Sequence, residues 1–251
     1  MKKKIFYIFA HQDDEFGTFV KLEKDIKKNN TFVFYLTTGS NKKNKKMFLR
    51  NQESIKTLIS LGLSKKKIFF IGRNLNINQN KLYLNMDKVY LNLIKIIKKI
   101  GRPNSVITHS WEGGHEDHDA CNLIGRKIAF RHNIINNCMQ FSLYNSYETF
   151  LIYFNVFNPI EKKNGKKYFA NFNKRVLFIK LLFNYKTQLK IWLGLYPFII
   201  FHYLFKGFNF MEKLNSHKTV KRPHTDLLLY EKRNFCTFKK FKSKTKHFLN
   251  D

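Results

Sequence analysis

Residues 4–15 read Lys-Ile-Phe-Tyr-Ile-Phe-Ala-His-Gln-Asp-Asp-Glu. The unbroken apolar run after Lys4 is typical of a parallel strand that is covered on both faces. It ends on a histidine and three acids, although the chain has 47 Lys and Arg against only 17 Asp and Glu. We therefore predict a buried strand at residues 4–10 that ends in a polar site, followed by a helix over residues 15–28.

A second acidic cluster follows another predicted strand, at residues 105–108. Together, residues 11–15 and 112–119 hold seven of the 17 acids and three of the nine histidines. Both clusters come directly after a strand and before a helix. We therefore expect them at the carboxyl edge of one sheet, where open α/β folds place their sites. Imidazole and carboxylate together are the ligands that a divalent metal of the zinc type prefers.

The rest of the first 150 residues alternates predicted strands with predicted helices. This alternation predicts an α/β fold with a Rossmann-like parallel sheet, whose core spans residues 1–150. The pattern is looser in the smaller C-terminal region, residues 151–251, and we expect this extension to complete the core and the substrate pocket. The remaining predicted elements are strands at 31–37, 68–71 and 139–144, helices at 47–61, 82–100 and 117–132, and a hairpin of 155–163 with 167–172 around Asn164-Gly165.

The apolar segment 191–205 is shorter than the ~20 residues that span a bilayer. We expect this segment to pack in the core. The alternative is peripheral contact with a membrane, in which Trp192 and Tyr196 face the lipid. In that case the protein lies at the inner face of the membrane.

The formal net charge of +30 raises the question of a nucleic-acid or anionic-membrane partner. The lysines are scattered along a chain that is also rich in Asn, Ile and Phe, a composition that indicates A/T-rich codons. No nucleic-acid-binding motif accompanies them, so we expect no specific nucleic-acid partner. The three cysteines have no Cys-x-x-Cys spacing, which predicts reduced thiols and a cytoplasmic protein.

Within the clusters, His11 and Asp14 are three residues apart at the entrance to a helix, which places both side chains near its first turn. His118 can supply a third ligand from the other loop and leave one position for water, as catalytic zinc sites do. Such a metal lowers the pKa of the water and polarises a carbonyl group. Asp13 is then placed to take the proton of the water, and His115 to hydrogen-bond the oxyanion or to protonate the leaving amine.

Each cluster alone also has an ordinary structural interpretation. Two histidines at His-x-x-His spacing often only share a helix face, and acids after a strand can be a helix N-terminal charge cluster worth about 1 kcal/mol or less. Two clusters at two strand ends of one sheet favour the functional interpretation. His109 is a competing candidate ligand, but it needs a different loop path from His115 and His118.

Three segments also carry a resemblance to a known family. Ala10–Glu15 reads Ala-His-Gln-Asp-Asp-Glu, Thr108–His118 ends in Gly-His-Glu-Asp-His, and Arg50–Glu53 is followed by Leu61-Gly62-Leu63. Over about residues 4–130, in order and spacing, these segments resemble the PIG-L/LmbE-like family of metal-dependent N-deacetylases. Its motifs are Ala-His-Pro-Asp-Asp-Glu, Gly-His-Pro-Asp-His and Arg-x-x-Glu…Leu-Gly. The resemblance implies a Rossmann-like fold, a zinc-type metal and hydrolysis of an N-acyl group of an amino sugar.

The resemblance also implies roles for single residues. His11, Asp14 and His118 are then the metal ligands, Asp13 is the general base, and His115 stabilises or protonates the reacting group.

Further residues are candidates for substrate binding. Arg50 has this role by resemblance, with an Arg–Glu pair inside its helix as the ordinary alternative. Trp111 and Glu112 are candidates for lining the pocket, because aromatic faces suit sugar rings. Gln12 and Glu116 stand where the family commonly has proline, which changes the rigidity of the loops but removes no ligand.

The sequence therefore predicts a zinc-dependent N-deacetylase that acts on an amino sugar or sugar conjugate, such as a precursor of a glycan or surface polysaccharide. One divalent metal is expected, Zn²⁺ first and Fe²⁺ as the alternative. Two other functions stay open. One is a metal-dependent esterase, because the same groups hydrolyse esters, and the other is a non-catalytic protein of this fold that binds a membrane or a glycan.

Overall fold

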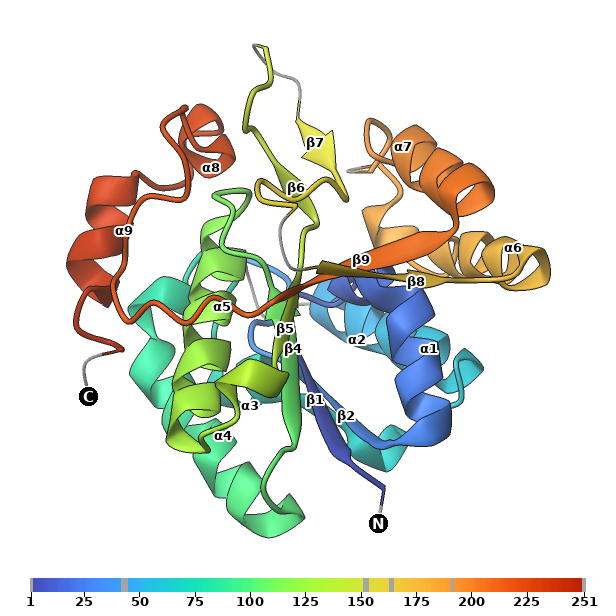
Figure 1. Ribbon diagram of the computed structural model, residues 1–251, viewed down its shortest axis with the longest axis horizontal. Helices are drawn as coiled ribbons and strands as arrows, with labels where there is room; N and C mark the ends of the chain where they lie inside the picture. The colour runs from blue at the N-terminus through green and yellow to red at the C-terminus, as the bar shows by residue number, and fades with distance from the viewer. Residues whose placement is uncertain (1, 42–44, 151–153, 163–164, 191, 250–251) are drawn as a thin grey trace.

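The computed structural model describes residues 2–41, 45–150, 154–162, 165–190 and 192–249. Its centre is a seven-stranded sheet with the order β3-β2-β1-β4-β5-β9-β8 (Figure 1). The first five strands in this order are parallel, and β9 continues the sheet with antiparallel pairing to both β5 and β8. This mostly parallel sheet confirms the predicted α/β fold class. The strands are β1 (Lys4–Phe9), β2 (Asn30–Tyr35), β3 (Ile68–Phe70), β4 (Ser105–His109), β5 (Met139–Phe141), β8 (Gly165–Phe169) and β9 (Phe208–Lys213), with β6 (Tyr144–Asn145) and β7 (Asn155–Val156) in a separate two-stranded sheet.

Helices cover both faces of the sheet (Figure 1). One layer contains α1 (Phe19–Lys28), α2 (Lys45–Ser60), α6 (Phe172–Leu182) and α7 (Tyr196–Phe201). The other layer contains α3 (Ile71–Leu75), α4 (Met86–Ile100), α5 (Glu116–Arg131), α8 (Leu229–Lys232) and α9 (Phe238–Thr245). The 3₁₀ helices are η1 (Asp14–Thr18), η2 (Lys65–Lys67), η3 (Leu82–Leu84), η4 (Ile135–Asn137) and η5 (Lys186–Gln188), and η6 (His202–Lys206) is a π-helix that directly follows α7.

The central strand β1 alternates its side chains between these two layers. Tyr7 and Phe9 belong to the apolar cluster that contains α1 and α6, whereas Phe6 and Ile8 belong to the cluster that contains α4 and α5. Successive strand residues point to opposite faces of a sheet, so a strand covered on both faces is apolar throughout. This explains the unbroken apolar run after Lys4 and confirms the predicted burial of the strand.

The chain leaves the centre of the sheet in two directions. From β1 it continues outward to β2 and β3, and it later returns to β4 on the other side of β1 and continues to β5. The direction therefore reverses between β1 and β4, and the crevice at the carboxyl ends of such a strand pair is the usual ligand site of an open sheet. The two acidic clusters follow β1 and β4, so this topology brings them together.

The predicted hairpin of 155–163 with 167–172 is wrong. β7 pairs with β6, and β8 pairs with β9, which itself pairs with β5. The physical reason is that β5 would otherwise be an edge strand with unpaired backbone groups, which β9 satisfies. Asn164 lies outside the described residues. The predicted strand 139–144 is also divided, because β5 ends at Phe141 and β6 begins at Tyr144.

The extension beyond residue 150 supplies two strands to the main sheet and side chains to both apolar clusters. In the apolar segment, Trp192, Ile199 and Tyr203 are only 6 %, 0 % and 0 % exposed. This confirms core packing for one face of the segment, while Ile191 lies outside the described residues. Among the helices of the described residues, none has the length and apolar character needed to cross a membrane. The domain boundary at residue 150 stays a prediction.

Candidate active site

The crevice between β1 and β4 brings together the predicted metal ligands. His11 Nδ1 lies 3.3 Å from His118 Nε2, although the two residues are 107 positions apart. Asp14 joins them from the same loop as His11, with Oδ1 3.3 Å from His118 Nε2 and Oδ2 3.6 Å from His11 Nδ1. All three side chains are buried, and one ligand atom from each lies within 4.8 Å of the others. Two imidazole nitrogens and a carboxylate oxygen that converge in this way fit a zinc-type cation.

Asp117 orients one of these ligands. Its Oδ2 lies 3.0 Å from His11 Nε2, so it fixes the ring with Nδ1 turned toward Asp14 and His118. The Asp117 carboxylate is held in turn by the backbone N–H groups of Asn80, at 2.6 Å, and Leu82, at 3.0 Å. A carboxylate behind a ligating histidine is the common outer partner of protein metal sites.

A second group of potential ligands, His11 with His115 and Asp117, also lies within 4.8 Å. The Asp117 oxygens and Nδ1 of His115 are already engaged. Asp117 accepts two backbone N–H groups, and His115 Nδ1 accepts the N–H of Asp117 at 3.1 Å, which caps helix α5. The first group is therefore the better metal site.

Asp14 is a carboxylate among three histidines. Burial alone raises the pKa of a carboxyl group, but His118, His109 and His11 hold the pKa of Asp14 well below its usual range. His109 Nε2 contacts Asp14 Oδ2 at 3.0 Å, and its ring stacks on the His118 ring with 3.9 Å between the centroids. The structure thus places His109 behind Asp14 rather than among the three converging ligand atoms.

Asp13 has an unusual backbone conformation, with φ at 111°. Its N–H donates to Glu15 Oε2 at 3.0 Å, and its Oδ1 accepts from Arg50 Nη2 at 3.0 Å. Burial raises the pKa of Asp13 to about 7, against the opposing charge of Arg50. A carboxylate with a pKa near neutrality, at the edge of the metal group, suits a general base.

Glu15 stabilises this backbone conformation of Asp13. It is fully buried, and its Oε1 accepts from Tyr185 Oη at 2.8 Å while Oε2 accepts the N–H of Asp13. No role of Glu15 or Tyr185 was predicted from the sequence. Glu15 stands directly after the two acids in the motif, but only the fold shows that a residue from the distant extension pairs with it.

Arg50 connects three backbone segments at the site. Its guanidinium donates to the carbonyl oxygens of Gln12, at 2.5 Å, and Gly39, and to the Asp13 carboxylate. Gly39 has φ +63°, and a Cβ there would lie 2.1 Å from Gln12 Oε1 and 3.0 Å from the Arg50 guanidinium, so any other residue would be strained and would displace these side chains. The alternative of a pair between Arg50 and Glu53 is not formed. Glu53 instead accepts from the backbone N–H and the hydroxyl of Thr187, at 2.9 and 2.6 Å.

His115 lies beside the three converging ligands, with its ring centroid 4.7 Å from that of His11. Burial and the nearby His11 and His118 keep the pKa of His115 well below its usual range, so the ring is neutral. Because Nδ1 accepts a backbone N–H, the proton of the neutral ring is on Nε2. Nε2 is buried and has no hydrogen-bond partner among the described residues. It is a free donor.

A cavity of about 110 Å³ opens beside these groups. His11, Asp13, Asp14, Arg50 and His115 line it, together with residues that the sequence analysis did not name as lining the site. Three of those, Gln188, Trp192 and Leu195, come from the extension. The others are Phe16, Lys46, Gln79, Leu143 and Tyr144.

Trp111 and Glu112 do not line this cavity. The Trp111 ring contacts Phe241, and its Nε1 donates to the carbonyl oxygen of Lys221 at 2.9 Å. Glu112 is 1 % exposed, and its carboxylate accepts four hydrogen bonds. Their donors are Ser142 Oγ at 2.5 Å, the N–H groups of Leu143 and Tyr144 at 2.8 and 3.2 Å, and Asn145 Nδ2 at 3.0 Å.

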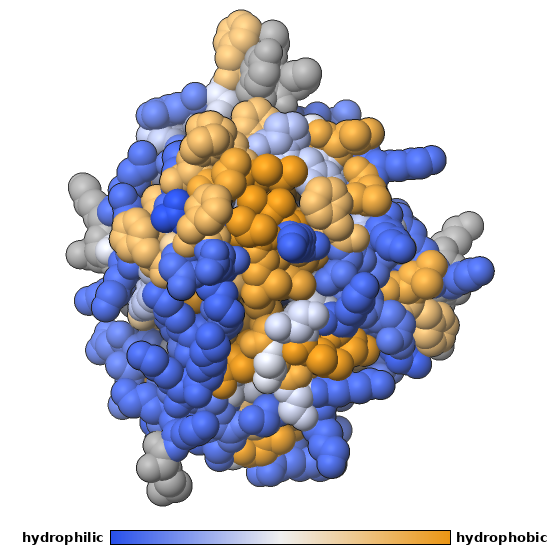
Figure 2. Space-filling view, turned by 90° about the vertical axis from the view of Figure 1, so that its right-hand side faces the viewer, coloured by the Kyte–Doolittle hydropathy of each residue, from blue (hydrophilic) through white to orange (hydrophobic). Residues whose placement is uncertain are grey.

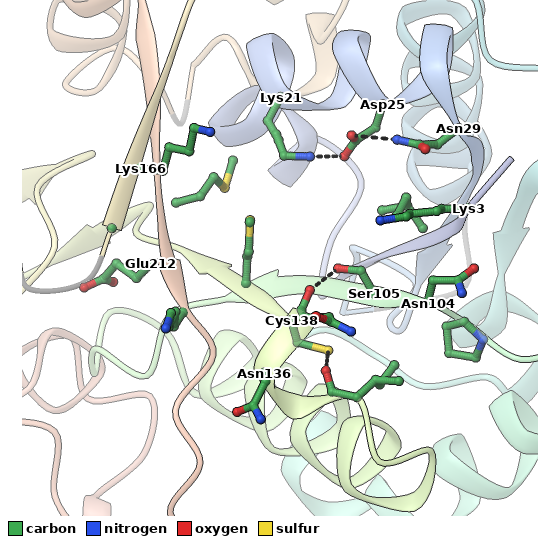
Figure 3. A pocket seen from close by; sticks show the side chains of 18 of the residues that line it. Lys3, Lys21, Asp25, Asn29, Asn104, Ser105, Asn136, Cys138, Lys166 and Glu212 are labelled. Atoms are coloured by element: carbon green, nitrogen blue, oxygen red, sulfur yellow. Dashed lines mark hydrogen bonds and ion pairs between the residues drawn. The ribbon is translucent and has the colours of Figure 1, made fainter.

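A larger cavity, of about 830 Å³, lies at the opposite, amino-terminal edge of the sheet (Figure 3). It is lined by Lys3, Ser105 and other residues near the starts of strands. The Lys21 ammonium and the Asn29 amide both bond to Asp25 at its wall. None of the predicted metal ligands or catalytic residues lines this cavity, so its size does not make it the active site.

The sequence profile of one protein family, described as PIG-L: GlcNAc-PI de-N-acetylase, matches residues 6–129. This stretch contains both acidic clusters and Arg50. The chain belongs to the PIG-L family. It is a family of de-N-acetylases, and the segment that matches it includes all three converging ligands of this PIG-L chain. No curated protein matches the chain.

Solved structures of similar fold include N,N'-diacetylchitobiose deacetylase from Pyrococcus horikoshii, at 19 % identity and a TM-score of 0.60, with 86 % of each chain covered. The zinc-inhibited form of teicoplanin deacetylase Orf2 is similar at 12 % identity and a TM-score of 0.55, over 75 % of this chain and 86 % of that one. The conserved protein TT1542 from Thermus thermophilus has 15 % identity and a TM-score of 0.55, over 90 % of this chain and 100 % of that one. At these identities the likeness shows a shared fold.

Proposed function

We propose that this PIG-L family member is a metal-dependent hydrolase that removes the N-acetyl group of an amino sugar or sugar conjugate. The observation that carries the proposal is the convergence of His11, Asp14 and His118 beside a cavity that Asp13 and His115 also line, with Nε2 of His115 unpaired among the described residues. These are the parts that hydrolysis of an amide requires: a cation site, a base and a donor for the oxyanion.

His11 Nδ1, His118 Nε2 and an Asp14 carboxylate oxygen would hold the metal. When bound, such a cation acidifies water and polarises the substrate carbonyl. We propose Zn²⁺, with Fe²⁺ as the alternative. The mixed nitrogen and oxygen donor set supports this choice. It is also supported by the similar fold of teicoplanin deacetylase Orf2, whose structure is that of a zinc-inhibited form.

Asp13 is the proposed general base. It takes a proton from the attacking water and later gives it to the amine that leaves, so that hydrolysis yields acetate and the free amino sugar. Arg50 holds the Asp13 carboxylate in place, and Glu15 holds the Asp13 backbone. Arg50 also lines the cavity and remains a proposed substrate contact.

His115 is proposed to stabilise the oxyanion. The His115 ring lines the cavity, and its Nε2–H has no partner among the described residues, so this donor is available to the oxygen that becomes negative in the transition state. This geometry favours hydrogen bonding over proton delivery. Trp111 and Glu112 are left out of the proposed substrate contacts, because both are engaged away from the cavity.

The proposed substrate class rests on the family description, which names a de-N-acetylase of a GlcNAc conjugate, and on the chitobiose deacetylase of similar fold. An ester of similar shape is the second candidate, because the same base and donor serve ester hydrolysis. We also keep the proposal of a cytoplasmic protein. It is supported by the three cysteines, all described, which are buried and form no disulfide.

The test is acetate release by zinc-reconstituted protein from a panel of N-acetylhexosamines and their nucleotide conjugates. Asp13→Asn is run beside it, after metal analysis shows that the variant keeps its zinc. Release that disappears with chelator and with Asp13→Asn supports the proposal. Release of acetate only from O-acetylated sugars would replace it with the esterase function. Zinc-loaded protein that releases acetate from neither class would contradict both.

A further inference from the structure

The segment from Phe183 to Lys206 carries large apolar side chains on the outside of the molecule. Phe183, Leu193, Phe198, Phe201 and Phe205 are 53 %, 73 %, 58 %, 55 % and 64 % exposed, and we call these five side chains the apolar face. Figure 2 shows this side of the molecule as an apolar area that is bordered by hydrophilic residues. Single exposed apolar residues are ordinary, but a group of them marks an interaction surface.

The helix that carries most of the apolar face is apolar on both sides. Phe198, Phe201 and Phe205 follow one another at spacings of three and four residues along α7 and η6, and the rings of Phe201 and Phe205 lie 4.7 Å apart. Ile199 and Tyr203, on the other side, are fully buried. A surface helix of a soluble domain is usually polar on its outer side, so this outer side is suited to an apolar environment.

The charged residues of the chain segment that carries the apolar face have one sign. Between Glu161 and Glu212 the sequence contains ten Lys and Arg and no Asp or Glu. Lys180, Lys186 and Lys190 are exposed within the same segment. A second copy of the chain would bring the same positive charge against this face, which opposes self-association.

We propose that the apolar face and its lysines dock the protein on an anionic membrane surface. Aromatic and leucine side chains enter the boundary between headgroups and acyl chains, and the lysines contact anionic headgroups. The two features support each other, because one hydrophobic anchor or one basic patch alone gives only weak, reversible binding.

The segment that carries the apolar face also lines the catalytic cavity. Gln188, Trp192 and Leu195 line that cavity, and Leu193 of the apolar face stands between two of them in sequence. One wall of the cavity is therefore built from the segment that touches the lipid. Docking does not depend on the proposed function, since it is measured as binding.

The structure changes which residues test this idea. Trp192 and Tyr196, which the sequence suggested as lipid-facing residues, are not suitable positions for testing membrane contact. The Trp192 ring packs against those of Phe16 and Tyr185, with centroids 4.8 and 5.4 Å apart, and Tyr196 Oη donates to the carbonyl oxygen of Leu182 at 3.0 Å. Replacing them would disturb the core rather than the outer surface.

The experiment is co-sedimentation of the full chain with phosphatidylcholine vesicles that contain or lack phosphatidylglycerol. We expect binding only to the anionic vesicles, and weaker binding at high salt. Phe198→Ser with Phe201→Ser should lower the partition coefficient about tenfold or more. The matched control is Leu84→Ser with Leu91→Ser, two exposed apolar residues in η3 and α4, which should leave binding unchanged.

The charge is tested by a second matched pair. The first double variant is Lys186→Glu with Lys190→Glu, and the second is Lys95→Glu with Lys99→Glu. Each changes two exposed lysines four residues apart, and the two variants lower the net charge equally. Only the first pair should release the protein from anionic vesicles. Equal loss in both pairs would show a general effect of the net charge, and absent binding by the unchanged protein would also overturn the proposal.

A dimer in light scattering that Phe198→Ser with Phe201→Ser dissociates would assign the face to self-association instead. Unchanged circular dichroism and thermal unfolding serve as the folding control.

Discussion

The two acidic clusters look alike in sequence, but their side chains are used in opposite ways. In the first cluster, residues 11–15, Asp13 and Asp14 face the cavity. In the second cluster, residues 112–119, none of the four acids lines the cavity, whereas His115 does and His118 supplies a converging ligand atom. The acids of the second cluster instead accept hydrogen bonds from nearby loops and helix ends. An acidic cluster is thus either reactive or structural according to which backbone donors surround it.

The largest effect is expected for His118→Ala. This change removes one of the three converging ligand atoms, so zinc should be lost and acetate release should fall to background. Glu116→Gln, in the same cluster, is the matched control and should keep both, because Glu116 bonds to Asn80 Nδ2 outside the cavity. Metal content by mass spectrometry checks this directly. Zinc bound as tightly by His118→Ala as by the unchanged protein would mean that the ligand set is different.

Asp13→Asn should lower kcat about 10²–10⁴-fold, the usual contribution of a general base. The amide keeps the size of the side chain and can still contact Arg50, so metal content and thermal stability should stay close to those of the unchanged protein. Steady-state kinetics on zinc-loaded protein make the measurement. A change in KM with an unaltered kcat would assign Asp13 to substrate binding.

Asp117→Asn should weaken zinc affinity about 10–100-fold without removing a ligand. The reason is that Asp117 orients His11 through its second nitrogen, and an amide is a poorer acceptor than a carboxylate. Competition with a chromogenic chelator gives the affinity. If excess zinc fails to restore kcat, Asp117 acts on more than the orientation of His11.

Glu112→Gln should lower the free energy of unfolding by about 1–3 kcal/mol, because the amide nitrogen cannot accept from the donors that now face the carboxylate. Burial raises the pKa of Glu112 to about 7, although Ser142, Leu143 and Asn145 donate to it and oppose that shift. Urea unfolding followed by circular dichroism measures the change. An unaltered stability together with a raised KM would instead favour the sequence-based prediction that Glu112 binds substrate.

Much of the site could be predicted from the sequence, because strand ends and motif spacing are local features. The run after Lys4 predicts a central strand, and the order of polar residues after it predicts His11 and Asp14 at its end. The partners of the second cluster could not be predicted in this way. Asn80 lies before η3 and Leu82 is the first residue of η3, and nothing in the local pattern indicates that their N–H groups hold Asp117, because these contacts exist only after the sheet has formed.

The pairing of β8 was also not predictable from periodicity, although a strand was predicted at residues 167–172. β8 is mostly exposed and contains two lysines, so it lacks the apolar alternation of a half-buried strand. It is a strand because β9 pairs with it along five residues, from Gly165 opposite Glu212 to Phe169 opposite Phe208. Pairing at a sheet edge can outweigh local preference.

The pairing of β9 with β5 makes the segment that matches the family, residues 6–129, dependent on the extension. The family match ends at residue 129, but β5 and the pair formed by β9 and β8 complete the sheet beyond that point. A protein cut after residue 150 would present β5 as an open edge and would lose Gln188, Trp192 and Leu195 from the cavity wall. The matched segment is therefore not a transferable module, and grafts or truncations that retain only that segment should aggregate rather than work as small enzymes.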